Sequence, residues 1–268
     1  MVASLFSAAR DCLEAATPEV KLALSSATAQ AFARGELDIP ADAPLPQPIR
    51  MPGRPPRPVL VHPRALPKRG LGSAAGRAAF VHAIAHIEFN AIDLAWDAVY
   101  RFRGLPRADY ADWVAIASDE ARHFAMLRER LQQLGFDYGD FDAHNGLWEM
   151  AESTAHDGLA RMALVPRVLE ARGLDVTPGM IVKLRALGDQ ATVAILEVIL
   201  REEIAHVAAG SRWFRWHCEQ TAVDPAQKFC ALLGQYAHPV LQGPFNEQAR
   251  LAAGFSEQEI AWLRANSR

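Results

Sequence analysis

The sequence ADWVAIASDEARHFAMLRERLQQL, residues 111–134, decides the fold class. Its apolar residues return every three or four positions, which is the periodicity of one buried face of an α-helix. Glu120 and His123 lie within this helix, three residues apart. Three residues turn a helix by about 300°, so the two side chains point within about 60° of each other, one turn apart. The pair can therefore chelate one metal ion.

The same Glu-x-x-His pattern returns at Glu203 and His206. A helix with the same periodicity precedes each pair and carries a glutamate. Glu88 precedes Glu120 by 32 residues (120 − 88), and Glu170 precedes Glu203 by 33 (203 − 170). A single buried glutamate is more often part of a structural ion pair. The repetition instead predicts two similar helix pairs that bring four carboxylates and two imidazoles together.

This pattern resembles ferritin-like di-iron and di-manganese proteins, in which two helices each supply a Glu and two others each supply Glu-x-x-His. Four carboxylates offset the charge of two divalent ions, and imidazoles favour iron over calcium or magnesium. Manganese, or a mixed manganese and iron pair, also suits such ligands. Open coordination positions would let the metals activate dioxygen. We predict two iron ions held by Glu88, Glu120, His123, Glu170, Glu203 and His206.

No alternating strand pattern is present, so the predicted class is all-α. Helical periodicity predicts long helices at about 77–102 and 109–134, and from 189 to about 218. A third helix is expected at 147–172, kinked by Pro166 and ended at Gly173, with Thr177-Pro178 starting a short helix to 187. The composition of residues 4–34 suits one or two short helices. Residues 224–265 suit two more, which are separated near 239–244.

Ten prolines crowd residues 39–67, where they prevent a continuous helix or a central strand. We expect an extended connector, either laid along the bundle surface or solvated. The predicted organisation is a ferritin-like four-helix bundle with additional terminal helices: an N-terminal helical segment (1–38), the connector (39–72), the bundle (73–220) and C-terminal helices packed on it (221–268).

Two further groups of polar residues lie close to the predicted ligands. His82 and His86 have a spacing that can bind a metal, but His86 lies on a different helical face from Glu88, so we favour an orienting or structural role. The third predicted helix carries many polar residues, which form either a buried hydrogen-bonded network or the lining of a substrate pocket. The candidates in this group are Glu152, His156, Arg161 and Arg167.

Composition narrows the partners and the compartment. The chain has 28 basic and 31 acidic residues and a net charge of −3, which argues against nucleic acid as the main partner. Three cysteines without ligand spacing suggest free thiols in a reducing compartment. An export signal and a long apolar run are both lacking, so we predict a cytoplasmic protein without a membrane partner.

Four segments carry a more specific resemblance: His86–Asp93, Tyr138–Phe141, Leu164–Asp175 and Glu202–Val207. They resemble a ferritin-like family catalogued as domain of unknown function 455, and the resemblance covers nearly the whole chain. That family is similar in fold to non-haem di-iron monooxygenases that hydroxylate a prenylated adenosine in tRNA. The resemblance implies a fold and a metal site but no assigned substrate. It also decides for Glu170, since Glu152 shares its predicted helix face.

Three functions remain open from the sequence. The favoured one is a di-iron oxidoreductase that uses dioxygen, and an electron donor, to oxidise a small molecule or a modified nucleoside. The second is metal handling, as a ferroxidase or storage protein. The third is metal binding without catalysis. Fold and site type recur across many chemistries, so they do not identify the substrate.

Overall fold

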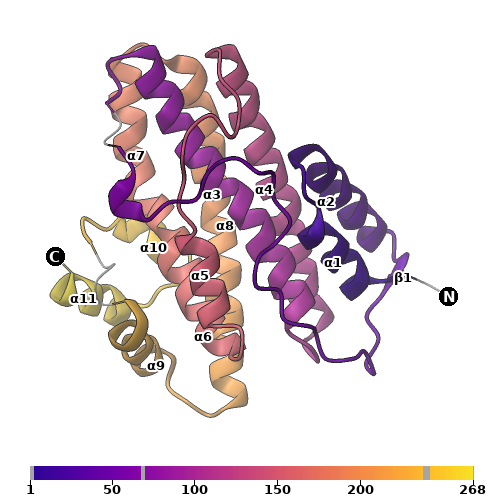
Figure 1. Cartoon of the computed structure of the whole chain (residues 1–268). Coiled ribbons are helices and arrows are strands. Elements are labelled where there is room, and N and C mark those ends of the chain that lie inside the picture. The colour runs from indigo at the N-terminus through magenta and orange to yellow at the C-terminus, as the bar shows by residue number, and fades with distance from the viewer. Residues whose placement is uncertain (1–2, 68–69, 238–241, 268) are drawn as a thin grey trace. The chain divides into compact units, whose positions relative to one another are not determined.

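The computed structural model describes residues 3–67, 70–237 and 242–267, and it confirms the all-α class (Figure 1). The chain forms two compact units, residues 1–152 and 153–268. The boundary between them falls inside the segment that we predicted as one bundle, and the predicted division stays a prediction. Among the described residues, no helix is both long and apolar enough to cross a membrane.

Unit 1 begins with two short helices, α1 (Leu5–Glu14) and α2 (Pro18–Ala33), as predicted. Thr17 caps α2 by accepting a hydrogen bond from a first-turn amide, and a proline takes the first helical position, where an N–H has no helical partner anyway. Two-residue strands, β1 (Ala3–Ser4) and β2 (Leu37–Asp38), pair in parallel at the two ends of this helix pair.

Two long helices follow, α3 (Ala74–Arg101) and α4 (Arg107–Gln133), close to the predicted spans. Only residues 102–106 separate them, so they run antiparallel and pack against each other. Helix α1 packs on α3, and α2 packs on α4. The N-terminal helices therefore cover the helices that carry Glu88, Glu120 and His123.

A buried ion pair joins these layers. The ammonium of Lys21 donates to a carboxylate oxygen of Asp93, and both side chains are fully buried. The same ammonium donates to the carbonyls of Cys12 (3.0 Å) and Leu13 (3.3 Å), which end α1. Burial raises the pKa of Asp93 to about 6, although the charge of Lys21 acts in the opposite direction.

The described part of the proline-rich connector lies along the surface of unit 1, which is the first of our two alternatives. The amide of Gly53 donates to the carbonyl of Leu13 (2.7 Å), and that of Val61 donates to the carbonyl of Ala143 (2.8 Å). These backbone bonds fix the segment at two points, one near its middle and one nearer its C-terminal end. Residues 68–69 of the predicted connector lie outside the described residues.

Two short elements accompany the connector. The 3-10 helix η1 (Pro63–Ala65) interrupts it, and α5 (Gly146–Ser153) follows the loop after α4 and ends at the boundary of the two units. Trp148 in α5 is buried, and its indole N–H donates to the carbonyl of Arg50 (2.8 Å). The connector is thus held from a second side.

Unit 2 corrects the predicted third helix. In place of one kinked helix at 147–172, α5 ends and a new helix, α6 (Gly158–Leu164), begins because Asp157 caps it, accepting from two first-turn amides. A π-helical turn, η2 (Val165–Glu170), follows and contains Pro166. The proline therefore lies in a local widening of the helix, where the usual hydrogen bonding is already interrupted.

The predicted helix end at Gly173 and the predicted start at Thr177-Pro178 were also wrong. Helix α7 (Ala171–Ala186) runs through all three positions, with Pro178 inside it. Pro178 removes one backbone hydrogen bond, but the buried face of α7 packs on the next helix and holds the chain helical. Tertiary packing has outweighed the local signals here.

The next helix, α8 (Gln190–Gln220), is the longest and was predicted within a few residues. It follows Gly188, whose φ of +77° supplies the left-handed turn that glycine adopts without strain. The remaining elements are short: α9 (Pro225–Leu232), the π-helical turn η3 (Leu233–Ala237), α10 (Glu247–Ala252) and α11 (Glu257–Asn266). Part of the predicted separation near 239–244 lies outside the described residues.

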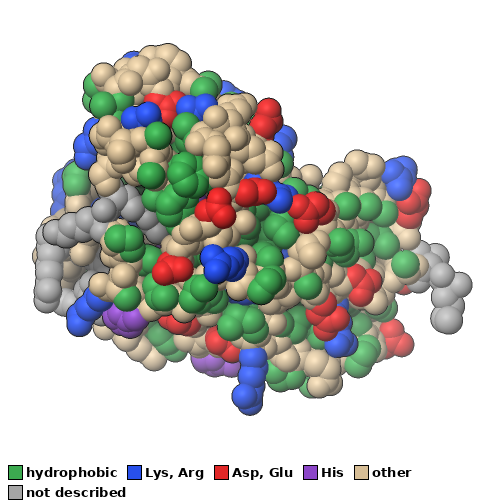
Figure 2. Space-filling model, turned by 45° about the horizontal axis from the view of Figure 1, so that its top comes forward, with side chains coloured by type: hydrophobic (Ala, Val, Ile, Leu, Met, Phe, Trp, Pro, Cys, Tyr) green, Lys and Arg blue, Asp and Glu red, His purple; other side chains and the backbone are tan. Residues whose placement is uncertain are grey.

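The surface mixes charges of both signs. Figure 2 shows acidic and basic side chains interspersed with apolar ones on one face. Exposed ion pairs such as Arg34 with Glu36 (2.7 Å) and Arg185 with Glu197 (2.6 Å) are part of this mixture. Pairs of this kind contribute little to stability, because water and salt screen the attraction between exposed charges.

Candidate metal centre

Unit 1 brings three of the predicted ligands together. Glu88 lies on α3, and Glu120 and His123 lie on α4. Nδ1 of His123 is 3.3 Å from a carboxylate oxygen of Glu88 and 3.3 Å from one of Glu120. Ligand atoms of the three side chains lie within 4.8 Å of one another, and all three side chains are buried. We call these three residues the unit 1 half-site.

The antiparallel helix pair explains this meeting. Gly104 lies in the short connection, and Glu88 and Glu120 are equally far from it along the chain (104 − 88 = 120 − 104 = 16). Each helix rises 1.5 Å per residue, so equal steps back from one turn reach the same level of two packed helices. His123 lies one helical turn further along α4 and on the same face.

Electrostatics couples the three side chains. Burial by itself lowers the pKa of the His123 imidazole, but hydrogen bonds and negative charge from Glu120 and Glu88 outweigh it and raise the pKa to about 11. Without a metal, the imidazole therefore carries a proton that offsets one carboxylate charge. This group of buried Glu and His side chains could bind a metal ion, whose charge would take the place of that proton.

Unit 2 holds the other three predicted ligands, the unit 2 half-site. Glu203 and His206 are buried on α8, and Nδ1 of His206 is 3.4 Å from a carboxylate oxygen of Glu203. Their spacing on one helix face is therefore as predicted. Glu170 is the last residue of the π-helical turn and is half-buried. Gly188, in the short turn between α7 and α8, lies 18 residues after Glu170 (188 − 170) and 15 before Glu203 (203 − 188), so the equal spacing about Gly104 in unit 1 is not repeated here.

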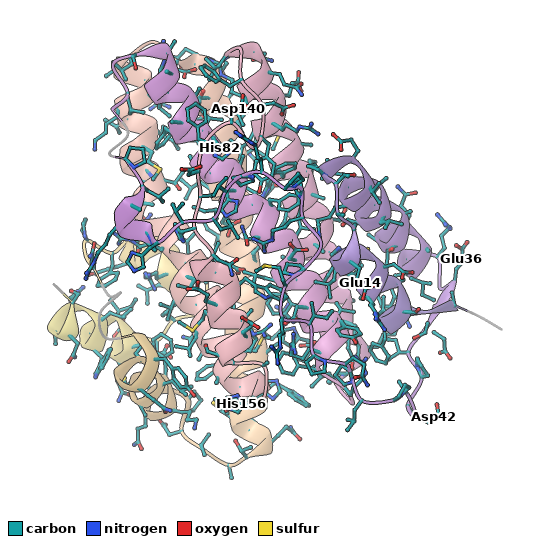
Figure 3. The ribbon with its side chains drawn as sticks, viewed as in Figure 1. Glu14, Glu36, Asp42, His82, Asp140 and His156 are labelled. Carbon is teal, nitrogen blue, oxygen red and sulfur yellow. The ribbon has the colours of Figure 1, made fainter. Side chains whose placement is uncertain are left out.

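His82 and His86 hold a loop against α3. Nε2 of His82 accepts from the amide of Gly139 (2.9 Å), and Nδ1 of His86 lies 2.9 Å from the hydroxyl of Tyr138. Burial lowers the pKa of His86 to about 3, so this imidazole stays neutral. Figure 3 labels His82 of α3 and Asp140, which lies in the loop that His82 holds. Both imidazoles therefore hold the loop, and the orienting or structural role that we favoured for them over metal ligation stays a prediction.

That loop explains one motif of the sequence. The residues Tyr138-Gly139-Asp140-Phe141 fold onto α3 because Tyr138 and Phe141 contact the imidazole of His82. The φ of Gly139 is +108°, and a Cβ there would lie 3.1 Å from Arg57 of the connector, so glycine suits this position. The motif therefore fastens the loop and the connector to the helix that carries Glu88.

The polar residues expected on the third predicted helix are in fact dispersed over separate elements. Glu152 and His156 are exposed, in α5 and in the turn before α6, where Figure 3 labels His156. Arg161 is buried and donates to the hydroxyl of Thr154 (2.8 Å). The prediction that Glu152 shares a helix face with Glu170 was wrong, because the predicted helix is broken between α5 and α6.

Arg167 is buried in the π-helical turn. Its guanidinium donates to Ser211 (3.1 Å) and Glu259 (2.8 Å), and burial lowers its pKa, an effect that Glu259 opposes. No pattern in the sequence pointed to Glu259 as the partner of Arg167, because the two residues are 92 positions apart. The ion pair of Lys21 with Asp93 in unit 1 was not predicted either, because a single Lys in a short helix is usually a surface residue.

Comparisons with known proteins place the chain in a family. The model of a family described as "Protein of unknown function (DUF455)" matches residues 14–261, which include all six predicted ligands and the connector. A relative from Haemophilus influenzae, described as an uncharacterized protein, is 47% identical over 216 residues, which cover 78% of this chain and 75% of the relative. No solved structure matches the chain. The chain therefore belongs to the DUF455 family of proteins of unknown function.

Proposed function

We propose that this protein binds two iron ions and uses them to activate dioxygen for the oxidation of an organic substrate. Glu88, Glu120 and His123 hold one ion, and Glu170, Glu203 and His206 hold the other. The unit 1 half-site carries the proposal, since two carboxylates and an imidazole meet there in a buried place. Manganese, alone or with iron, is the alternative occupant, because the same ligands suit it.

The ligands of the unit 1 half-site fit a divalent cation. Burying two carboxylates is costly unless their charge is offset. A proton on His123 offsets one charge, whereas a divalent ion with a neutral imidazole offsets both. Nδ1 of His123 already faces both carboxylates, so loss of its proton turns the same atom into a ligand.

The unit 2 half-site repeats this chemistry. Nδ1 of His206 faces Glu203 from one helical turn away, as Nδ1 of His123 faces Glu120. Glu170 supplies the second carboxylate. Two observations support this assignment: its position in the family motif and its place 33 residues before Glu203. Each half-site would then hold one ion, with the kinds of ligand that ferritin-like proteins use.

The oxidation itself follows from the metal and from the resemblance to di-iron monooxygenases. Bound ferrous ions would supply the electrons that reduce dioxygen. The protein's part is to hold the carboxylates and imidazoles in place and to keep bulk water from the buried ligands. An external electron donor would return the ions to the ferrous state. The substrate is an organic molecule, such as a modified nucleoside.

Metal analysis of anaerobically purified, iron-loaded protein tests the metal part. We expect two ions per wild-type chain, and a loss of metal in Glu120→Gln and Glu203→Gln. The matched controls are Glu129→Gln and Glu219→Gln, because these glutamates are exposed on the same two helices. Controls should keep both ions. Fewer than two ions in the wild-type protein under iron-replete conditions would contradict the proposal.

Admission of dioxygen to the loaded protein then tests the oxidative part. An enzyme awaiting its substrate should oxidise two ferrous ions per chain and stop. Continued oxidation of added iron far beyond that ratio would instead identify a storage or ferroxidase protein. Optical spectra before and after exposure follow the reaction, and circular dichroism of each variant checks that the helices are intact.

A further inference from the structure

The π-helical turn that ends at Glu170 is held by one buried side chain. Arg167 lies three residues before Glu170 and is only 2% exposed. Its Nε donates to the hydroxyl of Ser211 on α8 (3.1 Å), and its Nη2 donates to a carboxylate oxygen of Glu259 on α11 (2.8 Å). The turn is therefore tied to two separate helices by one guanidinium.

Aromatic rings enclose the same guanidinium. Its central carbon lies 4.3 Å from the ring centroid of Phe229, 4.4 Å from that of Phe255 and 4.7 Å from that of Phe214. A planar, delocalised cation stacks on ring faces, whereas the flexible ammonium of a lysine would not fill this place. The enclosure fixes the guanidinium plane as well as its position.

The partner carboxylate is fixed independently of Arg167. Glu259 belongs to a capping box at the start of α11, in which its second oxygen accepts from the amide (2.8 Å) and the hydroxyl (3.1 Å) of Ser256. One carboxylate thus caps α11 and binds the π-helical turn. A shift of α11 would be transmitted to Arg167 through this shared group.

Helix α8 confines the turn from another direction. Pro166 lies so close to Gly210 that a Cβ on Gly210 would be 2.4 Å from the proline Cβ. The turn therefore has little room to move toward α8. Gly210 is four residues after His206, so this contact lies one helical turn from a proposed ligand.

We propose that Arg167 is a positioning residue, which couples the C-terminal helix α11 through Glu259 to the π-helical turn and so sets the place of Glu170 as a metal ligand. The metal part of this inference rests on the proposed function. The mechanical part, that Glu259 holds the turn, does not depend on it. Groups that orient metal ligands commonly change metal affinity when they are removed.

The test compares two carboxylate-to-amide changes in unit 2. Glu259→Gln keeps a residue that can complete the capping box but removes the charge that holds Arg167. The matched control is Asp175→Asn, because Asp175 forms the other buried pair, with Arg250 of α10 (2.8 Å), and lies on α7 beyond Glu170. Both changes leave a buried arginine without its charged partner.

Two readouts are needed. Hydrogen exchange of the amides of residues 165–171 should be faster in Glu259→Gln than in Asp175→Asn. In titrations with manganese(II) followed by electron paramagnetic resonance, Glu259→Gln should weaken the affinity of one equivalent about tenfold or more. Asp175→Asn should leave the affinity as in the wild type. Glu170→Gln serves as the reference for loss of the ligand itself.

The outcomes separate the two proposals. Unchanged exchange in the turn of Glu259→Gln overturns the inference, whatever the metal does. Equal affinity in Glu259→Gln and Asp175→Asn overturns it as well, provided that Glu170→Gln loses metal. If wild-type protein and Glu170→Gln bind metal equally, the proposed role of Glu170 fails, and the metal part of the inference fails with it.

Discussion

The two half-sites come from nearly the same sequence pattern but rest on different backbones. In unit 1, Glu88 lies in the middle of a regular 28-residue helix that packs along its antiparallel neighbour. In unit 2, Glu170 ends a π-helical turn that a proline, a buried arginine and a close glycine contact hold in place. A similar spacing of ligands therefore does not require a similar local structure.

The two half-sites differ in what holds their ligand side chains in position. Long regular helices fix a ligand through many ordinary packing contacts, and a single substitution is absorbed among them. A π-helical turn has poorer regularity and depends on a few specific anchors. We expect the unit 1 half-site to be sensitive mainly to its ligands, and the unit 2 half-site to be sensitive to its supports as well.

The largest effect should come from the ligands themselves. Glu88→Gln and Glu170→Gln each remove one negative charge and one anionic ligand, so each should cost the protein one of its two proposed ions. Metal content after iron loading and gel filtration measures the loss. A variant of either position that keeps both ions would remove that residue from the ligand set and contradict the proposal of three ligands in each half-site.

Next in size is the buried ion pair of unit 1. Lys21→Met leaves Asp93 buried without its cation, which should lower the free energy of unfolding by about 3–5 kcal/mol. Urea denaturation followed by circular dichroism measures the change. The double variant Lys21→Met/Asp93→Leu is the control, because removal of both charges should restore most of the stability.

This destabilisation should depend on pH. The pKa of Asp93 in the folded protein, about 6 with Lys21 present, already lies above that of an unfolded Asp, about 3.9, and loss of Lys21 moves it higher. A raised pKa means that the stability contributed by the neutral acid is present below pH 4 and is lost as the pH rises through the folded pKa. Lys21→Met should therefore be less destabilised at pH 5 than at pH 8, and the reverse order would contradict this assignment.

A smaller loss is expected where unit 2 is most closely packed. Gly210→Ala places a methyl group against the ring of Pro166, and overpacking of this kind costs about 1–3 kcal/mol. Gly179→Ala is the matched control, since a Cβ there meets nothing within 4 Å. Thermal unfolding compares the two. Equal melting temperatures would show that the turn yields easily and would weaken the contrast between the half-sites.

The smallest effect tests the continuity of α7. Gly173 lies inside this helix with open space around it, so Gly173→Ala should raise the free energy of unfolding by about 0.5–1 kcal/mol. A helix that ended at Gly173 in a left-handed conformation would instead be destabilised by alanine. The sign of the change in urea denaturation distinguishes the two.

The pattern that predicted α3, α4 and α8 worked because long amphipathic helices repeat one signal many times. It failed at Gly173 and Pro178, because local helix-breaking signals cannot report the packing of α7 on α8. Glu120 and His123 could be paired from spacing alone, since helix geometry joins them. The partnership of Arg167 with Glu259 could not, because only the tertiary fold brings α11 to the π-helical turn.

The fastening of the connector at Gly53 bears on how the chain could be rearranged. A side chain on Gly53 would lie 2.2 Å from the carbonyl oxygen of Glu14, so the connector passes through a place with no spare room. Leu45, by contrast, is 82% exposed. New chain termini from circular permutation, or an inserted tag, should be accepted around Leu45 and rejected at Gly53. The proline-rich connector thus contains one site that should tolerate new termini and another that should not.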